Sequence, residues 1–333
     1  ERVGEAARRY LAGRGLGDEA IERFRIGFAP PEWRALREAA RRHGIEDAVL
    51  LEAGLLKASG RGGEPYDRLR GRIVFPILDL AGRVVALGGR VLGPAEEGVP
   101  KYLNSPETPI YRKGQALYGL YWARPAIRRA GTALVVEGYL DYISLAARGI
   151  EHVVAPLGTA LTPEQAGLIA RYARRAVLLY DSDPAGLRAT FRAADELLRA
   201  GVHPHVASLP AGEDPDSLVR AGGAAALEPY LAAAVDVVER KLQILEERGY
   251  FRDIDGKRKA LDGLLPTLRA ASDPALRDLY VARVAERTGV RRETLERALA
   301  GGRAAPRVRR AGGAPAGETA GPGAGLAAER LLL

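Results

Sequence analysis

The pattern of apolar and polar positions in the first third of the chain predicts short helices around a pair of strands. Residues 73–78 and 84–88 are apolar runs of strand length, and Asp79 to Gly82 between them have the composition of a tight turn. Apolar residues also recur at helical spacing in three short stretches, namely residues 3–12, 18–24 and 33–42. We therefore expect residues 1–130 to form a mixed α/β segment with one β-hairpin.

From residue 131 to about 225, apolar runs of strand length alternate with helical patterns. Thr162 can cap the second helix, Pro163 suits its first position, and Gln165 can complete a capping box. The expected strands are residues 133–136, 152–155, 176–180 and 202–209, and the expected helices are residues 139–148, 162–173 and 185–200. This alternation indicates right-handed βαβ units around a parallel sheet.

Beyond about residue 225 the strand signals end, and apolar residues recur at helical spacing to residue 300. The recurring positions are Val235, Val238, Leu242 and Leu245, followed by the stretches 261–268 and 275–284. We expect a small helical bundle over residues 226–300. Residues 301–333 are rich in Gly, Ala, Pro and Arg and can bury too little apolar surface to order themselves, so we interpret them as a linker or flexible tail.

The fold class expected from these patterns is α/β, with an α+β N-terminal segment, a parallel-sheet domain over residues 131–225 and a C-terminal helical bundle. A chain of 333 residues with 47% hydrophobic residues is long enough for two or three such domains. The chain begins at Glu1 and contains no methionine, so we interpret it as a piece of a longer protein.

Acidic residues follow three of the predicted parallel strands at the point where each strand ends. Glu137 follows the first strand, Asp181 and Asp183 follow the third, and Asp214 and Asp216 follow the fourth. Because ligands of open parallel sheets gather at the carboxyl ends of the strands, we expect these side chains to converge. Like charges at short range resist ionising together, and a divalent cation relieves that cost. The arrangement therefore predicts a metal site.

Oxygen ligands and a hard cation are expected at this site, because the chain has no cysteine and only four histidines. Two Mg²⁺ or Mn²⁺ ions ~3.5–4 Å apart would activate a hydroxyl group and stabilise a leaving pyrophosphate. No zinc site is expected in this chain. A structural alternative stays open for two of the acids, because Asp183 before Pro184 is also suited to cap a helix, and Asp216 could cap the short helix through Val219.

The charge of the chain favours a polyanionic partner and its hydropathy excludes a membrane protein. The net charge is +8 and the isoelectric point is about 9.7. No apolar run is long enough for a membrane helix. The absence of cysteine fits a cytoplasmic protein. No phosphate-binding loop of the nucleotide-hydrolysing motors is found.

Several motifs resemble those of a known family. Residues 137–141 together with residues 181–186 resemble the Toprim signature, which primases, topoisomerases and some nucleases share. Narrower motifs are similar to those of the bacterial DnaG-type primases, namely residues 70–77, 88–93, 100–108, 113–114, 117–119 and 212–216. The resemblance runs from the first residues to about residue 300. Ser182 stands where the family usually has glycine, and the cysteine-rich zinc module that precedes this core in the family is not found.

The resemblance implies DNA-dependent synthesis of RNA primers by nucleotidyl transfer during DNA replication. It implies that Glu137, Asp181 and Asp183 are catalytic and bind two Mg²⁺ or Mn²⁺ ions, with Asp214 and Asp216 as further metal candidates. In this hypothesis Glu137 and Asp181 hold the ion that activates the 3′-hydroxyl, and Asp181 and Asp183 hold the second. The residues implied in nucleotide and template binding are Arg70, Arg72, Arg90, Lys101, Asn104 and Lys113.

The partners implied are single-stranded DNA template, ribonucleoside triphosphates and the RNA–DNA primer duplex. A replicative helicase would bind through a C-terminal domain that we expect to be absent here, and the chain would be a cytoplasmic monomer at bacterial replication forks. Two alternatives stay open. A Toprim-type nuclease or topoisomerase fragment would use the same acids, and a non-catalytic single-stranded-DNA-binding module would use the positive charge alone.

Overall fold

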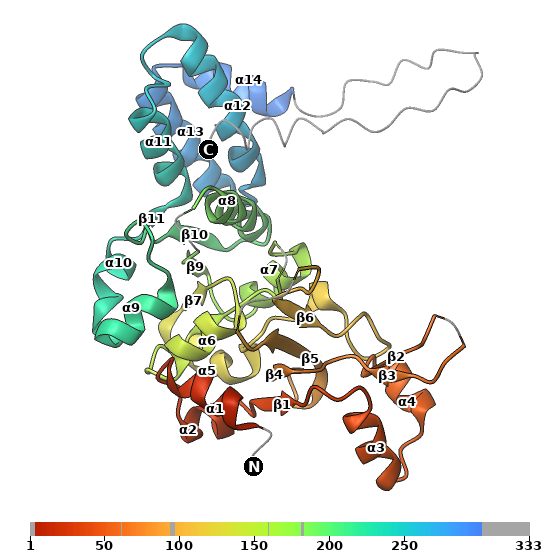
Figure 1. Ribbon diagram of the computed structural model, residues 1–333. Coiled ribbons are helices and arrows are strands. Elements are labelled where there is room, and N and C mark those ends of the chain that lie inside the picture. Colours follow the sequence, from red (N-terminus) through yellow and green to blue (C-terminus); the bar gives the residue numbers. More distant parts are fainter. Residues whose placement is uncertain (1–3, 61, 94–96, 159, 181–182, 302–333) are drawn as a thin grey trace, which may run out of the picture.

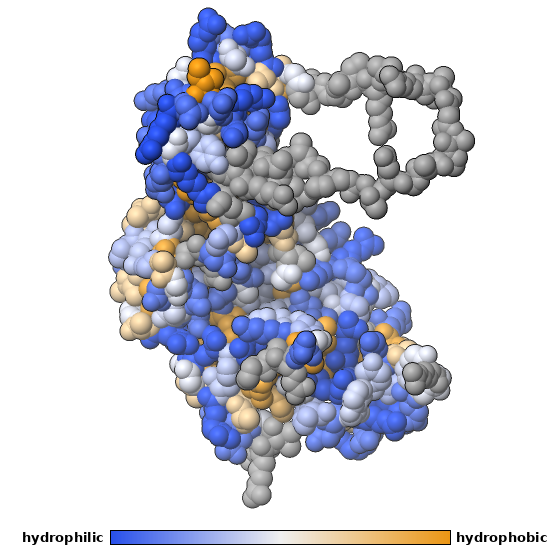
Figure 2. Space-filling model, turned by 45° about the horizontal axis from the view of Figure 1, so that its top comes forward, coloured by the Kyte–Doolittle hydropathy of each residue, from blue (hydrophilic) through white to orange (hydrophobic). Residues whose placement is uncertain are grey.

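The computed structural model describes residues 4–60, 62–93, 97–158, 160–180 and 183–301. The described chain contains two larger β-sheets, with the N-terminal helices at one end of the molecule and a helical bundle at the other (Figure 1). No described helix is both long and apolar enough to cross a lipid bilayer. The face seen in Figure 2 is mostly hydrophilic, with small apolar patches between the charged residues.

The first sheet is antiparallel and has the order β1-β4-β5-β6. Its strands are β1 (Gly27–Ala29), β4 (Arg72–Leu78), β5 (Val84–Val91) and β6 (Tyr102–Asn104). The predicted hairpin is β4–β5, and Asp79 closes its turn by accepting hydrogen bonds from the N–H groups of Ala81 and Arg83, both at 2.9 Å. The predicted pair lies inside a four-stranded sheet, and its outer strands β1 and β6 were not predicted because three residues are too few to show a periodicity.

Short helices and a two-stranded ribbon make up the rest of the N-terminal segment, and the last of these helices packs on the second sheet. They are α1 (Glu5–Ala12), α2 (Asp18–Arg23), α3 (Ala35–Arg42), α4 (Asp47–Glu52) and α5 (Leu120–Ala130), the 3₁₀ helix η2 (Lys113–Gln115), and the ribbon of β2 (Leu56–Lys57) and β3 (Tyr66–Asp67). Three of the helices lie where the apolar spacing predicts them. The helices α4 and α5 were not predicted, although α5 leads directly into the second sheet.

The second sheet has the order β11-β10-β9-β7-β8. Its strands are β7 (Thr132–Val135), β8 (Val153–Val154), β9 (Arg175–Leu178), β10 (His203–Val206) and β11 (Val235–Asp236). The first four are parallel to their neighbours, as predicted, whereas β11 is antiparallel to β10. The expectation that no strand occurs beyond residue 225 was therefore wrong. A two-residue strand has no period, and it directly precedes a helix that Asp236 caps.

Helices cover both faces of this parallel core. They are α6 (Tyr139–Ala146), α7 (Pro163–Ala170), α8 (Pro184–Arg199), α9 (Pro215–Gly222) and α10 (Glu228–Ala232), with the short 3₁₀ turn η3 (Ala224–Ala226) between the last two. The predicted capping box of α7 is present, since Thr162 Oγ1 accepts from the N–H of Gln165 and the Gln165 side chain accepts from the N–H of Thr162. Alternate residues along β7 and the position after it enter opposite cores. Ala133 and Val135 enter one core, and Leu134 and Val136 enter the other.

The predicted helical bundle comprises α11 (Val237–Glu247), α12 (Ile254–Ala270), α13 (Pro274–Thr288) and α14 (Arg292–Ala300). A buried polar contact joins it to α8. Lys241 Nζ donates to Thr267 Oγ1 at 2.5 Å, and the Thr267 hydroxyl donates to Asp195 Oδ1 at 2.7 Å. Lys241 is almost fully buried, and a buried cation requires polar partners such as the Thr267 hydroxyl. The predicted linker lies outside the described residues, except for Gly301.

Two histidines of the second sheet link its stability to pH. Burial lowers the pKa of His152, beside β8, and burial together with the nearby Arg175 lowers the pKa of His205, on β10. Below the unfolded-state pKa of about 6.5, the unfolded chain then binds more protons than the folded chain. Stability is therefore lost as the pH falls through this value.

We expect the melting temperature to fall between pH 7.5 and pH 5.5, and to fall by about 2 °C less in the double variant His152→Gln/His205→Gln. Glutamine keeps a neutral polar side chain but cannot take up the proton. Thermal unfolding followed by circular dichroism at both pH values measures the difference. An equal or larger fall in the double variant would contradict the assignment to these histidines.

Candidate active site

A cleft of about 350 Å³ lies where the carboxyl edge of the second sheet meets the first sheet. Among the described residues that line it are carboxylates from loops after β7 and β10 and cationic and amide side chains from the first sheet and the N-terminal segment. They include Glu137, Asp141, Asp214, Arg14, Arg90, Lys101 and Asn104, together with Tyr102 and Tyr139. The strand-end convergence predicted from the sequence is thus found for Glu137 and Asp214.

The turn between β7 and α6 holds Glu137 at the cleft. The N–H of Gly138 donates to Asp141 Oδ2 at 3.0 Å, so that Asp141 in the first turn of α6 stabilises the chain directly after Glu137. Asp141 also lines the cleft and was not among the predicted site residues. Its signal in the sequence was its position three residues beyond a glycine at a strand-to-helix turn.

Of the two aspartates after β9, only Asp183 is among the described residues. Asp181 lies outside the described residues, as does Ser182. Asp183 caps α8, and its Oδ1 accepts from the N–H of Gly186 at 2.6 Å. A carboxylate has about four acceptor positions, so this cap leaves Asp183 able to bind a cation as well. Among the described residues, no three acidic or histidine side chains are grouped closely enough to enclose a metal ion.

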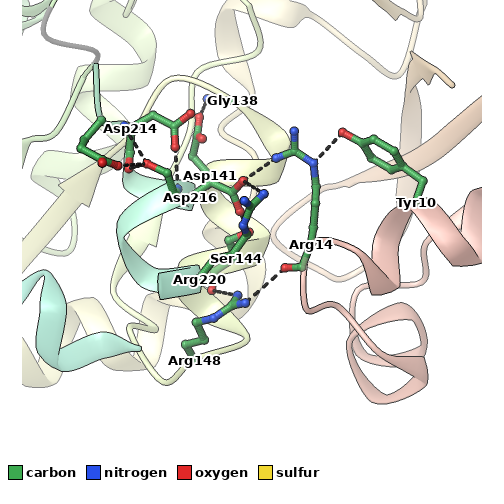
Figure 3. Close-up of polar contacts among 11 residues, drawn as sticks. Tyr10, Arg14, Gly138, Asp141, Ser144, Arg148, Asp214, Asp216 and Arg220 are labelled. Atoms are coloured by element: carbon green, nitrogen blue, oxygen red, sulfur yellow. Dashed lines mark hydrogen bonds and ion pairs between the residues drawn. The ribbon is translucent and has the colours of Figure 1, made fainter. Parts of the chain in front are cut away.

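The acids after β10 are oriented in opposite directions (Figure 3). Asp214 lines the cleft and caps α9, with Oδ1 accepting from the N–H of Ser217 at 2.6 Å. Asp216 is only 3% exposed and contacts Arg14, Ser144 and Arg220. The suggestion that Asp216 caps the short helix was therefore wrong, because the preceding Asp214 occupies the N-cap position.

Three of the predicted nucleotide- or template-binding residues line the cleft: Arg90, Lys101 and Asn104. The guanidinium of Arg90 lies 4.4 Å from the centroid of the Tyr10 ring, and its buried Nε has no hydrogen-bond partner among the described residues. Asn104 is held between two elements, since its Nδ2 donates to the carbonyl of Leu157 at 3.0 Å and its Oδ1 accepts from the Tyr139 hydroxyl at 2.8 Å.

The other three predicted residues, Arg70, Arg72 and Lys113, are not among the described residues that line the cleft. Arg72 is buried and donates to the carbonyls of Gly89, Pro100 and Lys101 at 3.0–3.3 Å. It therefore supports β5, which carries Arg90, and the backbone of Lys101 just before β6.

Arg70 and Lys113 lie at other positions around the first sheet. The Arg70 guanidinium stacks 3.9 Å from the centroid of the Trp33 ring. Lys113 is in η2, and its N–H donates to Glu107 Oε1 at 3.0 Å. The structure thus separates these two side chains from the cations that line the cleft.

Arg14 is a cleft residue that sequence reasoning missed. It follows α1, donates to the Tyr10 hydroxyl at 2.6 Å and forms an ion pair with Asp216. Burial alone would lower the pKa of Arg14, but Asp216 and Tyr10 more than offset this and raise it above its ordinary value. Nothing in the local sequence distinguishes Arg14 from its many arginine neighbours, because its partner lies 202 residues away.

The glycine pair of the motif Gly88-Gly89-Arg90 has a packing role. A methyl group at Gly88 would overlap the phenol ring of Tyr139, and one at Gly89 would lie 2.8 Å from Leu69 Cδ2 and 3.0 Å from Arg72 Cδ. The two glycines therefore allow Tyr139 of α6 to pack closely on one side of β5, and Leu69 and Arg72 on the other.

Comparison with known proteins assigns the chain to a family. The model described as the N-terminal domain of the DNA primase catalytic core matches residues 1–124, and a Toprim-like model matches residues 134–219. The chain is similar to the crystal structure of a DNA primase domain from Pseudomonas aeruginosa, with 40% identity, a TM-score of 0.80, and coverage of 89% of this chain and 92% of that one. The chain belongs to the DnaG-type primase catalytic cores.

Curated relatives support this membership. The DNA primases of Deinococcus radiodurans and Halalkalibacterium halodurans are 42% and 41% identical to this chain over 86% and 85% of its length. The chain spans about half the length of these relatives, 50% and 47% respectively. A DnaG primase catalytic domain whose structure is described as bound to single-stranded DNA is 38% identical, with a TM-score of 0.76 and coverage of 88% of this chain and 92% of that one.

The family comparison corrects the expectation about the helicase. A model described as the DnaB-helicase binding domain of primase matches residues 241–293, which form most of the bundle of α11 to α14. We had expected any helicase-binding domain to be absent from this chain. The bundle of this chain therefore contains a segment that matches a model described as helicase-binding.

We expect Gly88→Ala to lower the free energy of unfolding by about 1–3 kcal/mol, because the added methyl group displaces Tyr139 and thereby Asn104. Urea unfolding of the purified variant measures the loss. Gly167→Ala is the matched control: it lies inside α7 with no atom within 4 Å of an added methyl group, and we expect it to stabilise the chain slightly. Equal effects of the two substitutions would contradict the packing argument.

Proposed function

We propose that this chain catalyses template-directed synthesis of short RNA primers on single-stranded DNA from ribonucleoside triphosphates. The supporting observation is the cleft in which carboxylates from the ends of β7 and β10 meet Arg90, Lys101 and Asn104 of the first sheet. A metal site alone would suit either making or cutting a phosphodiester bond. Cations beside it supply the counter-charge that a triphosphate needs.

The donor set of the cleft fits a hard divalent cation, because Glu137 and Asp214 present carboxylate oxygens there and the chain has no cysteine. Glu137 and Asp181 would hold one Mg²⁺ or Mn²⁺ ion, and Asp181 and Asp183 the second, with Asp214 as a further ligand. When bound, such ions lower the pKa of an attacking 3′-hydroxyl and stabilise the leaving pyrophosphate.

The cations and amide of the first sheet would position the substrates. Arg90 is held against Tyr10 and can bind phosphate oxygens bidentately, whereas Lys101 acts as a point charge. Arg72 would act through them by holding the backbone of Gly89, Pro100 and Lys101. Arg70 and Lys113, outside the cleft, remain candidates for contacts to the template strand beyond the reacting nucleotides.

The wider organisation is also part of the proposal. Residues 1–130 would bind nucleotide and template, residues 131–225 would carry the catalytic acids, residues 226–300 would form the helical bundle, and residues 301–333 would be a linker. The bundle would contact the replicative helicase, in keeping with the family model that matches it. The chain would work as a monomer in the bacterial cytoplasm, at replication forks on an RNA–DNA primer duplex.

The metal assignment is tested by the substitution Asp183→Asn. Asparagine caps helices about as well as aspartate, so the stability of α8 should be kept, whereas the charge that binds the cation is lost. We expect unchanged urea unfolding and a fall in RNA synthesis of about 100-fold or more. Asp183→Ala should show the same loss of synthesis and an added destabilisation of about 1 kcal/mol. Full synthesis by Asp183→Asn would refute the role of Asp183 as a ligand.

The proposed reaction is tested by incubating the chain with single-stranded DNA, labelled ribonucleotides and Mg²⁺ or Mn²⁺. We expect short RNA products that disappear in Asp181→Ala and that require the divalent ion. Nicked DNA without RNA products would favour the nuclease alternative instead. DNA binding without either product, under conditions where a homologous primase core is active, would favour the non-catalytic binding module.

A further inference from the structure

Asp216 is surrounded by groups that use both of its carboxylate oxygens (Figure 3). The Ser144 hydroxyl on α6 donates to Oδ1, and Arg14 and Arg220 both contact Oδ2, the latter at 3.4 Å. The Asp216 side chain is only 4% exposed. A buried carboxylate is stable when it is paired and hydrogen-bonded in this way, and it has little capacity left for a further ligand.

The neighbouring Asp214 shows the contrast within one short motif. Asp214 lines the cleft, whereas Asp216 is not among the described residues that line it. Pro215 begins α9, so the two acids lie on different sides of the helix start. The side of α9 that carries Asp216 meets Ser144 of α6 and the chain after α1. Asp216 therefore lies where α9, α6 and the chain after α1 meet.

Arg14 is the partner through which Asp216 reaches the cleft. Its Nη1 pairs with Asp216, its Nε donates to the Tyr10 hydroxyl, and its carbonyl accepts from Arg148 at 3.2 Å. Its side chain is 26% exposed and lines the cleft beside Arg90. The Tyr10 ring lies under the Arg90 guanidinium, so the two cations share one support. A long side chain fixed at both Nε and Nη1 has one orientation instead of many.

We propose that Asp216 is a positioning residue that holds Arg14 at the cleft for contact with the phosphates of the nucleic acid or nucleotide, and that it is not a cation ligand. The inference deepens the proposed function and rests on it for the polyanionic ligand. Asp216 thereby joins the N-terminal segment to the sheet that carries the acids. It leaves cation binding to Asp214 and to the acids after β7 and β9.

Whether removal of the Asp216 carboxylate weakens or strengthens DNA binding distinguishes a positioning role from a purely electrostatic one. Removing a carboxylate near a polyanion should strengthen binding if only its charge matters. If Asp216 acts by orienting Arg14, its removal should weaken binding despite the lost negative charge. The measurement is the affinity of the whole chain for a fluorescently labelled oligothymidylate, by anisotropy at fixed salt, with EDTA present so that no divalent ion contributes.

We expect Asp216→Asn and Arg14→Ala each to weaken this binding about 3–10-fold, and the double variant to bind no more weakly than Arg14→Ala alone. Asp214→Asn, which keeps the helix cap and removes a charge at the same edge, is the matched control and should bind equally or more tightly. Unchanged or tighter binding by Asp216→Asn, or effects that multiply in the double variant, would overturn the proposal.

Two further measurements complete the test. The first replaces Asp216→Asn if that variant is unstable, and the second tests whether Asp216 binds a cation. Ser144→Ala removes one support of Asp216, and we expect a smaller loss of DNA binding that vanishes in the Arg14→Ala background. An equal loss in both backgrounds would overturn the positioning role. In the synthesis assay, the Mg²⁺ concentration for half-maximal rate should stay within about 2-fold in Asp216→Asn, and a shift of about 10-fold or more would make it a ligand.

The binding experiment requires neither metal nor catalysis. A wild-type chain that binds DNA but makes no RNA would therefore contradict the proposed function, while the comparison of Asp216→Asn, Arg14→Ala and the double variant would still decide the role of Asp216.

Discussion

The parallel strands are buried on both faces, and this burial restricts the charged residues of the site to the strand ends. Successive residues of β7 and β9 enter two different apolar cores, one toward α8 and the helical bundle and the other toward α6 and the first sheet. Charged side chains cannot be accommodated along such strands without partners. They are placed where the strands end, so Glu137 and Asp214 are found together at one edge although 77 positions separate them.

The first sheet brings positive charge to that edge through an aromatic contact. Tyr139 begins α6 directly after the acidic turn, stacks on Phe75 of β4 with ring centroids 5.1 Å apart, and donates its hydroxyl to Asn104 of β6. The absence of a side chain at Gly88 makes this approach possible. The residue that follows Glu137-Gly138 thus links the turn that carries Glu137 to strands of the first sheet, and its contacts join the two sides of the cleft.

Two of the acids proposed as metal ligands are also helix caps in this fold. Asp183 and Asp214 each accept from the first turn of a helix, which favours a negative charge at that position. A carboxylate at these positions can cap a helix and bind a cation at once, because each purpose needs only one of its two oxygens.

The apolar periodicity of the chain determined the parallel core, the β4–β5 hairpin, the bundle and the strand-end position of the acids, because these features depend on neighbours in sequence. The short strands β1, β6 and β11 were decided by tertiary pairing, since two or three residues carry no period. Asp214 and Asp216 show the same limit at the site. Both follow β10 and look equivalent in sequence, yet one lines the cleft and the other is buried against Arg14. Only the packing of α9 against α6 and the N-terminal segment separates them, because a contact across 202 residues leaves no local pattern in the sequence.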